Sequence, residues 1–348
     1  MEPQSKKKRE FERDIDLWVA YPVLSEEQSQ DPELIEAFAA PILDKKYTSS
    51  LIKELSSLYP LQGLQHIKRV RASKSSSHSL EVLLCLVGDV SDSRKKMDIS
   101  ALLPAERFRY DSLGDPFLVR VPVCAPLTRN QFEQVGKHWP TSFHEDKLIT
   151  LALKGQLFTD AQKIRMHAHM VVAVAAAKIA QESGMEAVGA VLVDRETKNI
   201  IAVGHDCRRN NHPFHHAVMV CIDLVARKQG GGAYIYEKYP ACKFTRSNSL
   251  HLYNEISPTS IIQQDMTSEE KGDQQYICTG YDLYVTREPC LMCAMALVHS
   301  RIGRVFYGTT SADGALGTKY KIHTQKGLNH CFEVFKGVMR QHCEDLCT

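Results

Sequence analysis

The chain has 348 residues, of which 43% are hydrophobic and 24% charged, values typical of a folded globular protein long enough for two domains. The net charge is only +2, so RNA binding would need local basic patches rather than an overall excess of positive charge. Eleven cysteines in a chain of this size, behind a polar N-terminus, exclude a small secreted disulfide framework, and no apolar run reaches the roughly 18 residues of a membrane helix. We therefore expect an intracellular protein with reduced thiols and no membrane association.

Residues 1–13 are expected to form a polar tail, which contains the basic run Lys6, Lys7, Lys8 and Arg9. Such a run is most simply a solvated segment, and it is also typical of nuclear-import signals and phosphate contacts. With these interpretations open, we expect the protein in the nucleus and the cytoplasm.

Residues 14–126 predict an N-terminal α+β domain. Its apolar patterns predict strands at 15–23, 64–72, 80–87 and 117–123, helices at 49–59 and 98–108, and a loop or short helix at 25–46. The order strand–helix–strand–strand–helix–strand is that of the ferredoxin-like split βαβ fold.

Two basic clusters lie between the predicted strands of this domain. If both face one side, they form a phosphate-binding patch, and we predict RNA contacts from Lys68, Arg69, Arg71, Lys74, Arg94, Lys95 and Lys96. A solvated basic face explains the same residues, because acidic and basic residues are nearly balanced over residues 1–150.

Residues 127–158 are expected to link this domain to a second one at 159–348. The second domain begins with a long buried helix, and its remaining patterns predict strands at 187–194, 199–206, 281–286, 301–308 and 331–335 with apolar helices at 218–226 and 294–299. Residues 229–280 interrupt this pattern with a polar, glycine-rich insertion that we expect to be partly disordered. Cys242 and Cys278, in or beside it, are expected to be plain thiols.

Cys290 and Cys293 follow Pro289 at the predicted start of a helix. Residues three apart share one helix face, and the positive end of a helix favours thiolates, so this pair forms half of a zinc site. His216 opens another apolar helix and can supply a third ligand. We therefore predict Zn²⁺ bound by His216, Cys290 and Cys293, with a water as the default fourth ligand and Cys343, Cys347 or the Thr348 carboxylate as the alternative.

The spacing matches the zinc deaminase signature, His-x-Glu followed by Pro-Cys-x-x-Cys, except that Val218 holds the glutamate position. In that signature the glutamate moves protons between the zinc-bound water and the base, and general acid–base catalysis is worth roughly 10²–10⁴-fold. Valine can do neither transfer. We expect the zinc site without the chemistry; the alternative is an active deaminase with a displaced carboxylate, for which Glu288 is a poor candidate because it belongs to the motif itself.

The region from residue 159 to about 340 resembles the cytidine deaminase-like fold, a five-stranded sheet with helices on both faces, and within it the tRNA adenosine deaminases. The resemblance rests on residues 189–193, 216–217, 288–302, 314–317 and 328–330. The valine at 218 and the additional N-terminal domain are typical of the non-catalytic subunits of the eukaryotic heterodimeric enzymes.

This resemblance implies a pseudoenzyme that binds zinc and tRNA and pairs with a catalytic sister subunit, which retains the glutamate and converts the wobble adenosine of the anticodon to inosine. It also implies a dimer interface along the zinc-binding helices. Met292, Met295 and Val298 are candidates for that interface, although core packing explains them equally well. A binding module unrelated to deamination is the third possibility.

Overall fold

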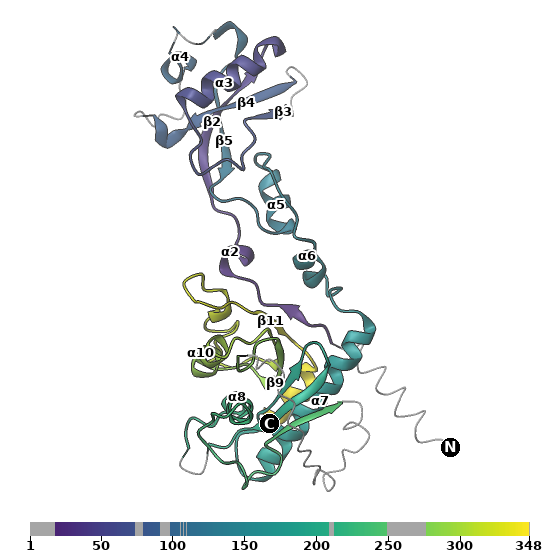
Figure 1. Ribbon diagram of the computed structural model, residues 1–348. Coiled ribbons are helices and arrows are strands. Elements are labelled where there is room, and N and C mark those ends of the chain that lie inside the picture. The colour runs from purple at the N-terminus through teal and green to yellow at the C-terminus, as the bar shows by residue number, and fades with distance from the viewer. Residues whose placement is uncertain are drawn as a thin grey trace, which may run out of the picture. The chain divides into compact units, whose positions relative to one another are not determined.

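The computed structural model describes residues 18–73, 79–90, 98–104, 106, 108, 110–208, 212–248 and 276–347, shown in Figure 1. The basic run at residues 6–9 lies outside the described residues, as do Lys74, Arg94, Lys95, Lys96 and Thr348. The chain divides into two compact units, one formed by residues 26–150 and the other by residues 1–25 together with 151–348.

The unit of residues 26–150 contains a four-stranded antiparallel sheet in its described part. Its elements are α2 (Glu26–Ser29), β2 (Leu34–Ile42), α3 (Thr48–Leu58), β3 (Val70–Ala72), β4 (Leu80–Leu86), α4 (Ile99–Leu102), β5 (Phe117–Pro122) and α5 (Arg129–Gly136), and α6 (Lys147–Leu153) follows across the boundary between the units. The sheet order is β3-β4-β2-β5. This order, with a helix after β2 and another after β4, confirms the ferredoxin-like fold.

The first strand of this fold is not the one that the sequence predicts. β2 lies within residues 25–46, which were expected to form a loop or a short helix, and its centre contains three alanines and one phenylalanine rather than β-branched residues. It is the strand that pairs with both β4 and β5, and it is buried on both faces: Ala37 and Ala39 pack with Trp139, and Phe38 and Ala40 pack with Leu51 and Leu55 of α3. Tertiary packing selects small residues there and overrides local strand propensity.

The predicted strand at 15–23 belongs to the other unit. Its described part forms β1 (Tyr21–Pro22), which pairs antiparallel with β11 (Glu333–Lys336), and Trp18 and Ala20 lie in the same core as Phe335. The placement of this segment in the N-terminal domain is therefore wrong, because its apolar side chains are buried by the second unit.

In the second unit, the described residues form a mixed seven-stranded sheet in the order β1-β11-β10-β9-β6-β7-β8. The remaining strands are β6 (Gly189–Asp194), β7 (Asn199–His205), β8 (Lys243–Asn248), β9 (Tyr281–Arg287) and β10 (Arg304–Thr309), and the helices are α7 (Asp160–Glu182), α8 (Ala217–Lys228), α10 (Leu291–His299) and α11 (Arg340–Glu344). β9, β10 and β11 run parallel, and every other pairing is antiparallel. Within the described part of the chain, none of the helices combines the length and the apolar character needed to cross a membrane.

Helices cover both faces of this sheet. α7 and α11 pack on one face, where Val191, Val193 and Phe306 point, and α8 and α10 pack on the other with Leu192 and Val305. Alternate residues of each strand thus face opposite cores. The expected α/β/α architecture is confirmed.

The segment 229–280 is not simply a surface insertion, because its described part belongs to the sheet and the core. Residues 243–248 form β8, the edge strand paired with β7, and both Cys242 and Cys278 are buried in the core. Residues 249–275 lie outside the described residues.

Gly189 allows α7 to contact β6 at van der Waals distance. A Cβ built on Gly189 would overlap the backbone of Ala173 and Ala177 in that helix. We predict that Gly189→Ala destabilises the protein by about 1–3 kcal/mol, because the helix must move outward. Thermal unfolding measures the change, with Gly327→Ala as the matched control, since the described residues leave open space around Gly327. An equal Tm for the two variants would contradict this packing argument.

Candidate metal centre

Two helices on the same face of the sheet begin close together, and each begins at a predicted ligand. α8 starts at Ala217 with His216 as its N-cap residue, and α10 starts at Leu291 with Cys290 as its N-cap residue. Cys293 lies in the first turn of α10. Pro289 stands before the cap, so the chain turns from β9 into α10 within three residues.

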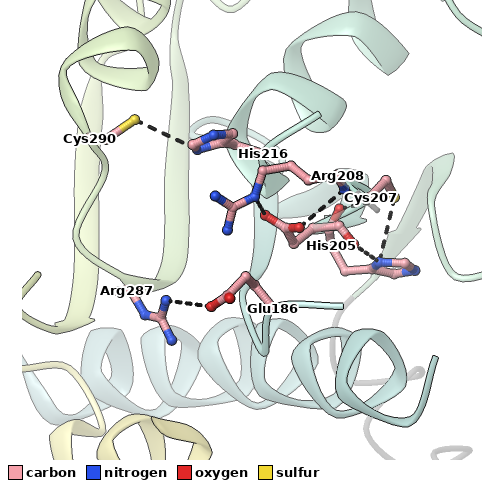
Figure 2. A network of polar contacts seen from close by, with 8 residues as sticks. Glu186, His205, Cys207, Arg208, His216, Arg287 and Cys290 are labelled. Atoms are coloured by element: carbon pink, nitrogen blue, oxygen red, sulfur yellow. Dashed lines mark hydrogen bonds and ion pairs between the residues drawn. The ribbon is translucent and has the colours of Figure 1, made fainter. Parts of the chain in front are cut away.

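The three ligand atoms converge. The Cys290 sulfur lies 3.6 Å from Nδ1 of His216 (Figure 2), and the ligand atoms of His216, Cys290 and Cys293 all lie within 4.8 Å of one another. A tetrahedral zinc ion with Zn–S of about 2.3 Å and Zn–N of about 2.0–2.1 Å places a sulfur and a nitrogen about 3.6 Å apart. The donor set and its spacing therefore fit zinc and leave one position for a fourth ligand.

The cluster already favours a thiolate without a metal. The hydrogen bond from Cys293, aided by His216, lowers the pKa of Cys290 to about 3. The same hydrogen bond and burial raise the pKa of Cys293. Cys293 is buried while His216 and Cys290 are half-buried, so the centre is reached from the side of the histidine and Cys290.

Val218 lies in the first turn of α8, two residues after the histidine ligand. Its side chain is buried in the apolar core beneath the two helices, with Ala217 and Val298 among the other members of that cluster. The side chain therefore acts as a core residue at the position where the deaminase signature has its glutamate.

Glu288 is buried, and both of its carboxylate oxygens accept hydrogen bonds from the loop at residues 311–318. The amides of Leu316 and Thr318 each donate to Oε1 at 3.0 Å, the amide of Ser311 donates to Oε2 at 3.2 Å, and the Thr318 hydroxyl also donates to Oε2. A Cβ at Gly314 would overlap this carboxylate. Glu288 therefore fixes the loop beside the metal centre and has no free oxygen lone pair directed at a substrate.

Asp206 is a second buried carboxylate near the centre, and sequence reasoning missed it. Its Oδ2 accepts from Nε of Arg208 at 2.7 Å and its Oδ1 accepts from the amide of Arg208 at 3.2 Å. Both residues act on the pKa of Cys293, Arg208 lowering it and Asp206 raising it, so this ion pair lies close to the cysteine. The only sequence signal was an acidic residue just after a buried strand.

The C-terminal cysteines lie away from the three ligands. Cys343 is buried on the α7 face of the sheet against Gly308, and the sulfur of Cys347 lies 3.6 Å from Nη2 of Arg287. Among the described residues, the cluster of ligand atoms contains neither cysteine. The alternative fourth ligand is thus limited to Thr348, which lies outside the described residues.

In the N-terminal unit, two of the predicted RNA contacts have internal partners. The Arg69 guanidinium donates to the carbonyls of Tyr59 at 2.6 Å and Leu84 at 3.0 Å. Arg71 pairs with Glu81 at 2.6 Å and lies 4.1 Å above the Trp139 ring. These arginines hold the sheet together and are not free for phosphates, whereas Lys68 is exposed.

Of the three interface candidates, Val298 is a core residue. It is buried beneath α10, while Met292 and Met295 are half-buried on the same helix. A role in a dimer interface therefore remains for the two methionines alone among these three.

Comparison with known families agrees with this architecture. Residues 164–309 match the family described as the cytidine and deoxycytidylate deaminase zinc-binding region, and residues 35–139 match the tRNA-specific adenosine deaminase TAD3 N-terminal domain. The fold and the His216, Cys290 and Cys293 cluster thus define a protein of the cytidine deaminase class with an additional N-terminal domain.

Full-length relatives narrow the class to one family. The chain is 61% identical to a Danio rerio protein over 100% of this chain and 99% of that protein, and 51% identical to a Homo sapiens protein over 94% and 91%, and both are named probable inactive tRNA-specific adenosine deaminase-like protein 3. It is also 26% identical, over 89% of this chain and 86% of the relative, to the Saccharomyces cerevisiae tRNA-specific adenosine deaminase subunit TAD3. The chain belongs to this TAD3 family of probable inactive deaminase-like proteins.

We predict that Glu288→Gln destabilises the second unit by about 1–3 kcal/mol, because an amide presents a donor to the amides that now donate to the carboxylate. Chemical denaturation of the full chain measures the effect. The exposed Glu182→Gln is the matched control and should change stability by less than about 0.5 kcal/mol. A neutral Glu288→Gln variant would show that the carboxylate is not required by the loop.

Proposed function

We propose that this chain is the non-catalytic, zinc-containing subunit of a tRNA adenosine deaminase, which supports adenosine-to-inosine conversion at the wobble position by binding tRNA and stabilising an active sister subunit. The observation that carries the proposal is the preserved cluster of His216, Cys290 and Cys293 beside a buried Val218. The names of the Danio rerio and Homo sapiens relatives support inactivity, and the name of the Saccharomyces cerevisiae relative supports a subunit role.

The residues of this centre would hold a zinc ion but would not complete the reaction. Zinc, when bound, supplies a water of lowered pKa. Deamination also requires a group that takes the proton of this water and returns it to the base and to the leaving ammonia. Val218 has no proton-accepting atom, and Glu288 uses its oxygens on four donors of the loop. The chain thus lacks the proton shuttle at the position where the chemistry needs it.

Among the described carboxylates near the centre, Asp206 is the one left for an active enzyme to use. It is 2% exposed, and both of its oxygens already accept hydrogen bonds from Arg208. A carboxylate held in this way by its neighbour is poorly placed to carry protons for a substrate. This contact disfavours the alternative of a displaced carboxylate.

We predict that inosine forms on a tRNA with a wobble adenosine when this chain and its sister subunit are combined, and not with this chain alone. Removing the shuttle glutamate of the sister subunit should abolish the activity of the pair, because both proton transfers depend on it. Asp206→Asn in this chain should leave the turnover of the folded pair within a few-fold. Inosine made by this chain alone, and lost in Asp206→Asn, would establish the displaced-carboxylate mechanism instead.

For tRNA binding we propose phosphate contacts from Lys68 together with Lys74, Arg94, Lys95 and Lys96, and we withdraw Arg69 and Arg71 because their guanidinium groups have internal partners. Such contacts position a folded RNA through its backbone and are weakened by salt.

We predict that Lys68→Glu weakens tRNA binding at moderate salt and reduces the dependence of log K on log salt by about one contact. Filter binding at several salt concentrations measures both quantities. Lys53→Glu, an exposed lysine of α3 outside the proposed patch, is the control for net charge. Equal losses in the two variants would mean that binding follows net charge rather than this patch.

A further inference from the structure

A second group of metal-binding side chains lies where β7 ends. His205 is the last residue of β7, Cys207 follows two residues later, and Cys242 immediately precedes β8. The ligand atoms of these three residues lie within 4.8 Å of one another, and the side chains are 1%, 0% and 5% exposed. This cluster shares no residue with the cluster of His216, Cys290 and Cys293.

The spacing inside the cluster is that of a tetrahedral thiolate site. The sulfur of Cys207 lies 3.8 Å from the sulfur of Cys242 and 3.6 Å from Nδ1 of His205 (Figure 2 shows the latter contact). Zinc–ligand distances of about 2.3 Å to sulfur and about 2.0–2.1 Å to nitrogen place two sulfurs about 3.8 Å apart and a sulfur and a nitrogen about 3.6 Å apart. Both separations therefore match, and the second equals the His216–Cys290 separation in the first centre.

We propose that His205, Cys207 and Cys242 form a second, structural site for a zinc-like divalent cation. The donor set of one imidazole and two thiolates suits zinc and selects against magnesium and calcium, which prefer oxygen ligands. The fourth position falls to a backbone carbonyl or a water molecule. This inference goes beyond the proposed function and does not depend on it.

The surroundings prepare the site for a cation. The sulfurs of Cys207 and Cys242 lie within hydrogen-bond distance of each other, and the amide of His205 donates to the sulfur of Cys242 at 3.4 Å. A metal binds cysteines as thiolates, so binding at this site releases thiol protons.

Binding also has a local cost. Nδ1 of His205 lies 2.8 Å from the backbone oxygen of Asp206, and it donates there when no metal is bound. A metal on Nδ1 needs its lone pair, so the proton moves to Nε2 and the Asp206 carbonyl loses this donor. The site thus exchanges one hydrogen bond for a cross-link between the end of β7 and the start of β8, the strand at the edge of the sheet.

The test is metal counting on the full-length chain by native mass spectrometry after purification with zinc and reductant. We expect two ions per chain in the wild type and one in the Cys290→Ser, Cys293→Ser variant. Adding Cys242→Ser to that variant should remove the remaining ion, whereas adding Cys278→Ser should not, because Cys278 is a buried cysteine outside both clusters. Cobalt in the first-site variant should give the near-ultraviolet charge-transfer band of a thiolate ligand.

A second route covers the case in which the first-site variant does not fold. In an otherwise wild-type chain, Cys242→Ser should lower the count from two ions to one. The proposal is overturned if the wild type holds a single ion that Cys242→Ser leaves in place, if the first-site variant holds none, or if Cys207 and Cys242 are recovered as a disulfide in the zinc-purified protein.

Discussion

The second unit depends on two helix N-termini that meet on one face of its sheet. β7 and β9 lie on either side of β6, and the segments that leave them return as α8 and α10 on the same face. Both helices begin at a ligand, so the backbone amides and the positive ends of the two helices point at the space between His216 and Cys290. A cation there would be attracted by thiolates rather than by the helix ends, and it would tie the two helices together. The three ligands would therefore serve the fold independently of any catalytic role.

The side chains around this centre are held in place by the fold itself. Val218 fills an apolar position under α8, and Glu288 is a structural carboxylate whose oxygens are saturated by the 311–318 loop. Because each of these side chains satisfies packing or hydrogen bonding by itself, the site needs no substrate to be stable. A glutamate at this position would instead place a carboxylate in the apolar core. Burying it costs free energy unless a ligand or a water molecule forms hydrogen bonds with it.

Local signals predicted that His216, Cys290 and Cys293 would come together, and tertiary context explains what such signals missed. The signals for this centre are local, because each spans only one or two helical turns, and local signals can be read from the sequence. They are Pro289, the spacing of Cys290 and Cys293, and the apolar helix after His216. β2 was missed because its alanines are chosen by burial on both faces, and Arg69 and Arg71 were taken as surface cations although carbonyls and Glu81 hold them. Positive charge in a sequence cannot show whether a guanidinium faces solvent or the backbone of a neighbouring strand.

The cysteines show most clearly what a sequence cannot reveal, because it does not distinguish a buried core cysteine from one that lies beside other metal-binding side chains. Burial is the main cause that raises the pKa of Cys85, Cys278 and Cys343 to about 12, and these side chains behave as small apolar residues. Cys242 is also buried and Cys290 is half-buried, yet each has a second thiol and a histidine beside it, and their pKa values fall to about 5 and about 3. A cysteine suited to bind a metal therefore differs from a cysteine that only packs in the core by having a thiol and an imidazole beside it. Only the fold brings these groups together. By that criterion Cys242 resembles Cys290 rather than the isolated thiols of the core, although 37 residues separate it from His205.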